Sequence, residues 1–190
     1  MEDDELMRRI QSGDRQAFDE LADQYYGPLV AFFFRNRRDS HLAEDLAQET
    51  LLRVYNEAWD YLPQGRFRGW LYRIARNLLI DALRRRPYDA LSGSRRALDP
   101  DTVLAQVASR NVPPAQRASG REIVALVEEM LLALPESQRT AFVLHHHGGL
   151  SLAEVAEVTE TTVSTAKSRL RLAREKLRDK LNRRGVEAPS

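Results

Sequence analysis

The 190-residue sequence contains no cysteine, which excludes disulfide bonds and metal sites built from thiolates. It also lacks a long hydrophobic run: residues 29–34 form one of the most apolar stretches, whereas a membrane-spanning helix needs about 20 such residues. The N-terminus is acidic and shows no basic segment followed by an apolar one, so no signal peptide is visible. We therefore expect a soluble, cytoplasmic protein without direct membrane insertion.

The net charge is only +1, so the balance of charge by itself indicates no partner. Its distribution is more informative. Residues 1–60 carry seven basic and fourteen acidic side chains, whereas residues 61–86 carry seven basic and one acidic. Residues 121–160 carry two basic and seven acidic side chains, whereas residues 161–184 carry nine basic and two acidic. An acidic block followed by a basic block occurs twice, which predicts two modules, each with a part suited to phosphate. Chance clustering is the alternative.

Apolar residues recur at helical spacing along most of the chain, and no strand is expected. The predicted fold is all-α, with two small helical domains joined by a flexible linker. The N-terminal domain covers residues 1–87, the linker residues 88–119, and the C-terminal domain, a helix-turn-helix, residues 120–184. The linker is assigned from its Ser, Gly and Pro content and its weak apolar spacing.

Local signals place the individual helices. In the N-terminal part we predict a helix at 3–11 and a second helix that is capped by Asp14 and ended by Gly27-Pro28. Residues 29–35 follow as a buried helix or, alternatively, a strand. The next helix is capped by Asp39 or Ser40 and runs to about Asp60, and a basic helix at 66–86 is ended by Pro87. The predicted C-terminal elements are helices at 121–134 and 136–147, a short helix opened by the capping box Ser151 to Glu154, and a last helix from about 163 to 181.

The basic helix carries the first candidate site. Its apolar stripe, which includes Trp70, is expected to pack into the core, and its other face is cationic and bears an amide and aromatic rings. Such a face suits a polyanion with exposed bases. An ordinary solvated basic face is the alternative. The candidate residues are Tyr61, Phe67, Tyr72, Arg73, Arg76 and Asn77, some of whose rings must belong to the core instead.

Two further candidate surfaces follow from helical spacing. Asp45, Gln48 and Glu49 share one exposed face, which could dock a basic protein surface or simply aid solubility. The C-terminal segment fits a helix-turn-helix whose last helix can enter a DNA major groove, although helical hairpins with basic outer faces are common. The side chains that could reach DNA are Thr165, Lys167, Ser168, Arg169 and Arg171.

Catalytic and metal sites are not indicated. His145, His146 and His147 are adjacent, so on a helix they point about 100° apart and cannot converge on one ion. Glu44 and Asp45 diverge for the same reason, and no nucleophile or base accompanies them. We expect no enzyme activity, no small-molecule substrate, no cofactor and no metal.

Two sets of motifs resemble the extracytoplasmic-function (ECF) sigma factors, the small two-domain type of sigma-70 family initiation factor. The first set is AEDLAQE at residues 43–49 and FRGWLYRIARN at 67–77, followed by Asp81 and the arginine run. The second set is LPESQR at 134–139, GLSLAEVA at 149–156 and KSRL at 167–170. The resemblance covers residues 12–181 apart from the linker.

The resemblance implies roles for the candidate residues. Asp45, Gln48 and Glu49 would contact the clamp helices of the polymerase β′ subunit. Tyr72, Arg73 and Asn77 would capture the unwound non-template strand at the minus-ten element, and residues 61–67 would form a pocket for a flipped base. Lys167, Ser168 and Arg171 would read the minus-thirty-five duplex. The C-terminal domain would meet the polymerase β flap, and an anti-sigma factor would wedge between the two domains.

The sequence departs from the family pattern at several positions, including Thr159, where an apolar residue is usual, and Ala166 in the recognition helix. A looser helix-turn-helix is therefore expected. Two rival functions stay open at this point: a stand-alone helix-turn-helix regulator that binds duplex DNA without polymerase, and an all-helical enzyme that processes nucleic acid.

Overall fold

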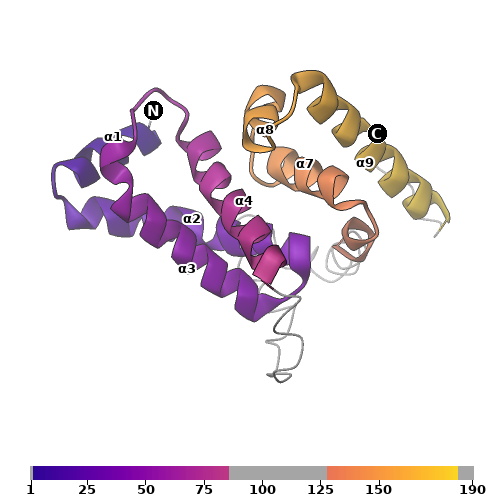
Figure 1. Cartoon of the computed structure of the whole chain (residues 1–190), viewed down its shortest axis with the longest axis horizontal. Helices are drawn as coiled ribbons and strands as arrows, with labels where there is room; N and C mark the ends of the chain where they lie inside the picture. Colours follow the sequence, from indigo (N-terminus) through magenta and orange to yellow (C-terminus); the bar gives the residue numbers. More distant parts are fainter. Residues whose placement is uncertain (1, 86–127, 184–190) are drawn as a thin grey trace, which may run out of the picture.

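The computed structural model describes residues 2–85 and 128–183, and it contains no strand within them, which confirms the all-α prediction. The N-terminal helices lie on one side and the C-terminal helices on the other, with α4 between them (Figure 1). The linker predicted at 88–119 and the helix end predicted at Pro87 lie outside the described residues. The elements are α1 (Glu2–Gln11), α2 (Arg15–Arg37), α3 (Ser40–Asn56), the short 3-10 helix η1 (Ala58–Asp60), α4 (Phe67–Arg85), α7 (Glu136–His146), α8 (Leu152–Val158) and α9 (Val163–Arg183).

Side-chain caps fix where several helices begin, as the sequence predicts. Asp14 accepts hydrogen bonds from the backbone N–H groups of Gln16 and Ala17 at the start of α2. At the start of α8, the Ser151 hydroxyl accepts from the Glu154 N–H at 3.3 Å, and the Glu154 carboxylate accepts from the Ser151 N–H at 2.8 Å. These bonds satisfy backbone donors that have no partner within the helix.

We expect Ser151→Ala to lower the free energy of unfolding by about 1 kcal/mol, because α8 has only seven residues and loses its N-cap. Urea denaturation followed by circular dichroism measures the change. As a control, Ser164→Ala replaces an exposed serine inside α9 and is expected to shift stability by less than about 0.5 kcal/mol. Equal losses in the two variants would contradict the capping role.

The predicted break at Gly27-Pro28 is wrong, because α2 runs without interruption from Arg15 to Arg37. A proline inside a helix removes one hydrogen bond and its ring crowds the preceding turn, at a cost of roughly 3 kcal/mol. Burial supplies the compensation. Pro28 itself is exposed, whereas all residues from 29 to 36 are buried, so the apolar segment packs only if the helix continues. The same contacts decide against a strand at 29–35.

The two halves of the chain pack against each other, α2 against α7 and α4 against α8. The Arg35 guanidinium forms a buried ion pair with Glu128, with Nε and Oε1 2.7 Å apart. Nearby, the Thr140 hydroxyl donates to the buried Asn36 side-chain oxygen at 3.0 Å. Two helical units are present, as predicted, but they are joined by direct contacts as well as by the chain between them.

The C-terminal half is built as a helix-turn-helix. Residues 128–132, the described part of the helix expected from residue 121, are helical and lead into α7. The departure at Thr159 is accommodated, because its buried hydroxyl donates to the Val155 carbonyl at 2.7 Å. Within residues 2–85 and 128–183, none of the helices combines the length and the hydrophobicity needed to traverse a lipid bilayer.

Candidate nucleic-acid interface

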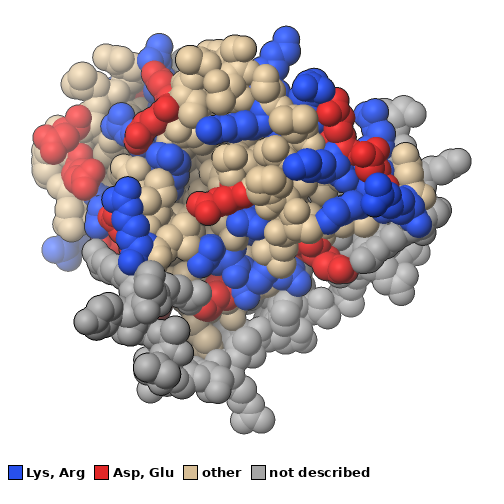
Figure 2. Space-filling model, turned by 45° about the vertical axis from the view of Figure 1, so that its right-hand side comes forward, with Lys and Arg blue, Asp and Glu red and all other residues tan. Residues whose placement is uncertain are grey.

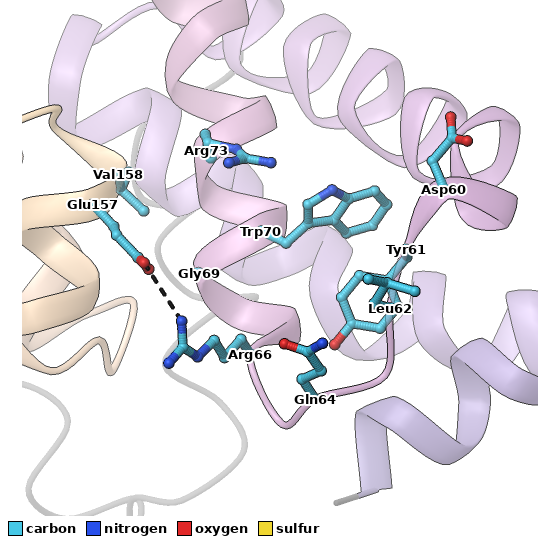
Figure 3. Close-up of a pocket in the computed structure, with 10 residues that line it drawn as sticks. All are labelled: Asp60, Tyr61, Leu62, Gln64, Arg66, Gly69, Trp70, Arg73, Glu157 and Val158. Atoms are coloured by element: carbon cyan, nitrogen blue, oxygen red, sulfur yellow. Dashed lines mark ion pairs between the residues drawn. The ribbon is translucent and has the colours of Figure 1, made fainter.

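A pocket of about 310 Å³, lined by polar and apolar groups, lies beside the N-terminal end of α4. One wall is the segment that precedes α4, residues 61–66, which we call the pocket loop; the opposite wall is α8 (Figure 3). The Trp70 ring lies against the Tyr61 ring, with centroids 4.9 Å apart, and both rings line the pocket. The pocket therefore combines aromatic faces with the guanidinium groups of Arg66 and Arg73, a combination suited to an unpaired base and its phosphate.

The six residues predicted to bind single-stranded DNA divide into two groups. Arg73 and Asn77 are exposed on α4, and Arg76 is half-buried. Tyr61, Phe67 and Tyr72 are the buried group, each no more than 4% exposed. Some of the candidate rings were expected to belong to the core, and these three do. In this conformation Phe67 and Tyr72 therefore offer no open face for stacking, whereas Tyr61 still borders the pocket.

The reason for the burial is aromatic packing with α2. Phe67 lies 5.3 Å from the Tyr25 ring and Tyr72 lies 5.4 Å from the Phe32 ring, both in edge-to-face geometry. Burial raises the pKa of Tyr72 to about 12, so its hydroxyl stays neutral. On α4, Tyr72 stands between the buried Leu71 and the exposed Arg73, and at 100° per residue a small rotation carries such an edge residue into the core.

The C-terminal half covers this side of α4. Glu157 and Val158 of α8 line the pocket, and Arg66 faces Glu157 with Nη1 and Oε1 3.6 Å apart (Figure 3). Ten residues farther along the chain, on α4, Arg76 pairs with Glu160 at 3.3 Å. Because Arg66, Glu157 and Glu160 are largely exposed, each pair contributes little to stability.

The acidic face of α3 is exposed. Asp45, Gln48 and Glu49 all reach solvent from one side of the helix, and Glu49 accepts a hydrogen bond from Arg53 at 3.2 Å. An apolar extension of this face was not predicted: Leu52 is 56% exposed and Tyr55 is 44% exposed. Leu52 follows Gln48 by four residues and Tyr55 follows Leu52 by three, so helical spacing could have revealed this extension.

The recognition helix α9 presents a cationic surface. Thr162 caps its start by accepting from the Thr165 N–H at 3.1 Å. Lys167, Ser168 and Arg171 are exposed, as predicted, and Arg171 pairs with Glu175 at 2.6 Å. Lys and Arg side chains are more abundant than acidic ones on the face drawn in Figure 2. These three side chains are therefore free to contact a partner from one exposed side of α9.

The other two α9 residues predicted to reach DNA, Thr165 and Arg169, are half-buried rather than exposed. Arg169 lines a cavity of about 440 Å³ between the two halves, together with Arg76 of α4. The prediction that Arg169 faces outward to duplex DNA is therefore wrong for this conformation. Residues 167–169 point about 100° apart in turn, so they cannot all share one face.

The histidines do not form a metal site. His145 Nδ1 lies 2.7 Å from the Leu150 carbonyl, whereas His146 Nε2 lies 3.2 Å from Arg174 Nε. Within the described parts of the chain, no group of three or more His, Cys, Asp or Glu residues is placed to hold an ion.

Taken together, the two helical units and their separate cationic surfaces define a DNA-binding protein of helix-turn-helix type. Residues 21–87 match sigma-70 region 2, and residues 125–177 match sigma-70 region 4. The chain is 32% identical over 176 residues to the ECF RNA polymerase sigma factor SigW of Bacillus subtilis, covering 92% of this chain and 94% of the relative. This chain therefore belongs to the ECF sigma factors of the sigma-70 family.

Solved structures agree on the fold. The structure of CnrH in complex with the cytosolic domain of CnrY matches with a TM-score of 0.69 and 24% identity, over 96% of this chain and 98% of that one. The sigma factor RpoE of Bartonella quintana, in complex with the anti-sigma factor NepR, matches with a TM-score of 0.65 and 24% identity, over 87% and 96%. At this identity the likeness concerns the fold.

Proposed function

We propose that α4 and the pocket loop capture the unwound non-template strand of a promoter at its minus-ten element. The observation that carries the proposal is the pocket itself, in which aromatic rings and arginines surround a space of about 310 Å³ beside the exposed Arg73 and Asn77. Taking a base out of the duplex costs a few kcal/mol, which pocket contacts can offset. Trp70 and the accessible edge of Tyr61 provide the stacking surface, in place of the buried Phe67 and Tyr72.

The exposed face of α3 is proposed to bind core RNA polymerase, through the β′ clamp. Asp45, Gln48 and Glu49 offer acidic and amide groups to a basic helical surface, and Leu52 and Tyr55 add apolar area. Interfaces of this kind combine an apolar centre with a polar rim. This face and the DNA pocket belong to different helices, so the chain can hold polymerase and promoter at once. The C-terminal half is proposed to contact the β flap.

The N-terminal part of α9 is proposed to read duplex DNA at the minus-thirty-five element through Lys167, Ser168 and Arg171. We expect Lys167→Ala to weaken duplex binding and to reduce the slope of log K against log salt concentration by about 1, because one phosphate contact is lost. Fluorescence anisotropy with a labelled duplex at several salt concentrations gives the slope.

Lys176→Ala is the matched control for this measurement. Lys176 is also exposed on α9, but it lies nine residues farther along, about 13 Å from the groove-reading turn. Its removal is expected to leave the slope unchanged. A slope that is unaltered by Lys167→Ala would contradict a phosphate contact at that residue.

Transcription with purified core polymerase tests the function as a whole. We expect the chain to direct run-off transcripts from promoters that core enzyme alone does not use. Duplex binding without any promoter-directed transcript would instead favour a stand-alone helix-turn-helix regulator. Nucleic-acid cleavage abolished by Asp45→Ala or Asp81→Ala would favour an enzyme.

The contact between the halves has a functional consequence within this proposal. The pocket lies against α8, and Arg76 pairs with Glu160, so separation of the halves would free the pocket and Arg76 for DNA, whereas Arg73 and Asn77 are exposed already. We propose that the chain opens when it binds polymerase and promoter. Regulation by an anti-sigma factor is likewise proposed for this chain, and a partner that holds the halves together would act on the same step.

A further inference from the structure

The pocket loop is held mainly by the N-terminal helix α1, which does not itself line the pocket. The loop contains few groups that could fix its own shape: Leu62, Gln64, Gly65 and Arg66 are all exposed. Gly65 has φ +75°, in the left-handed region that favours glycine, so the backbone turns sharply just before α4. Something outside the loop must therefore set its conformation.

Asp4 supplies two of these contacts. Asp4 is only 5% exposed, and its carboxylate accepts from the Tyr61 hydroxyl at 2.6 Å and from the Gly65 backbone N–H at 2.5 Å. One side chain thus connects the first residue of the pocket loop with the residue at its sharp turn. Burial, and then the hydrogen bond to Asp4, raises the pKa of Tyr61, which keeps the phenol protonated as a donor. Hydrogen bonds to an ionised carboxylate are among the stronger ones in proteins.

Gln11 supplies the other two contacts. Its side-chain amide nitrogen donates to the carbonyls of Ala58 and Tyr61, both at 2.8 Å. Both amide hydrogens are therefore used, one on η1 and one at the start of the pocket loop. Asp4 and Gln11 stand seven residues apart, two turns of one helix, so they lie on the same face of α1.

We propose that Asp4 and Gln11 are positioning residues that set which base the pocket accepts. The proposal rests on the proposed role of the pocket in binding a flipped base. Neither side chain lines the pocket, so each acts through Tyr61 and the loop backbone. Shape selectivity needs walls held to within about 0.5 Å, and these four hydrogen bonds fix the wall that includes Tyr61. The helix at the start of the chain thereby becomes part of promoter recognition.

Two substitutions at Asp4 separate positioning from charge. Asp4→Leu keeps the approximate size but leaves the Tyr61 hydroxyl and the Gly65 N–H without partners. Asp4→Asn removes the charge but retains both bonds, because the amide oxygen can accept from Gly65 and the amide nitrogen can donate to the Tyr61 oxygen. We expect the asparagine variant to behave like the wild type. Gln11→Met is the second disruptive variant: it removes two hydrogen bonds and changes no charge, because both side chains are neutral.

Asp14→Ala is the stability control. Asp14 caps α2 and pairs with Arg9 at 2.8 Å, so its loss destabilises the junction of α1 and α2 without removing a contact to the pocket loop. Thermal unfolding of each variant gives the size of the stability change. If Asp4 has a merely structural role, Asp14→Ala and Asp4→Leu should reduce the base preference for bound single-stranded DNA equally when they are compared at equal loss of stability.

The experiment selects single-stranded 12-mer DNA from a randomised pool with holoenzyme, reconstituted from each variant and purified bacterial core polymerase. Sequencing of the bound pool gives the base preference at every position. For the wild type we expect a strong preference at the position that enters the pocket, reduced at least about tenfold by Asp4→Leu and Gln11→Met. Asp4→Asn and Asp14→Ala should retain it.

Full retention of the preference by Asp4→Leu or Gln11→Met would overturn the proposal, as would a loss of the same size in Asp14→Ala. A wild-type holoenzyme that shows no base preference at any position is a different result. It would overturn the proposed function of the pocket, and with it the role given to α1.

Discussion

Replacing Arg73 and Asn77 together by alanine is expected to reduce open-complex formation at least about 30-fold while leaving polymerase affinity unchanged. Both side chains are exposed on α4 beside the pocket, so their removal should not disturb the core. Loss of one charged and one neutral hydrogen-bonding group amounts to about 2 kcal/mol or more, which corresponds to this factor. The proposed polymerase contacts lie on α3 and are not altered.

Permanganate reactivity of thymines in the minus-ten region measures strand opening, and fluorescence anisotropy with labelled protein measures binding to core polymerase. Arg15→Ala, which removes an exposed arginine from the first turn of α2, serves as the control for loss of positive charge. Reactivity equal to that of the wild type would contradict the assignment of α4 to the melted strand.

The second large effect is expected from Glu128→Ala. Glu128 and Arg35 form an ion pair at 2.7 Å, with side chains only 3% and 9% exposed. Removal of one partner leaves the other charge buried without compensation, which costs roughly 3–5 kcal/mol. Arg35 can return to water if the C-terminal half moves away, without unfolding of α2. We therefore expect the substitution to shift the protein toward separated halves.

Small-angle X-ray scattering should record a larger radius of gyration for Glu128→Ala than for the wild type. The affinity for single-stranded DNA should rise in parallel, because the pocket is no longer covered by α8. Glu5→Ala is the matched control: Glu5 pairs with Arg8 at 2.8 Å, but the two side chains are 64% and 54% exposed. Such a pair contributes roughly 0–1 kcal/mol. Unchanged dimensions and affinity in Glu128→Ala would contradict the closed arrangement in solution.

Local features of the fold could be predicted from the sequence. The caps at Asp14 and Ser151 depend on residues within four positions of each other, so the sequence displays them directly. The break at Pro28 was predicted wrongly because the rule is local, whereas the compensating burial of residues 29–36 comes from helices elsewhere in the chain. The presence of the helices could be predicted from the sequence. Whether distant packing would outweigh the local cost of Pro28 could not.

The candidate site shows the same division. The exposure of Arg73, Asn77 and Lys167 was predicted correctly from charge and spacing, while their contacts with DNA stay a prediction. The burial of Phe67 and Tyr72 could not be predicted, because aromatic residues occur both in hydrophobic cores and on surfaces that stack with bases. The pairing of Arg35 with Glu128 joins residues 93 positions apart, and no sequence pattern relates them. The hydrogen bonds that join Asp4 and Gln11 to η1 and the pocket loop span 47 to 61 positions, and no sequence pattern indicates them.

The continuity of α2 through Pro28 has a mechanical consequence. Its 23 residues make a rod of about 34 Å, and α1, α3 and α7 all pack along it. Because α1 holds the pocket loop and α7 belongs to the C-terminal half, a bend in this rod would displace both together. A substitution that kinks α2 near its middle should therefore disturb base selection and the docking of the C-terminal half at the same time.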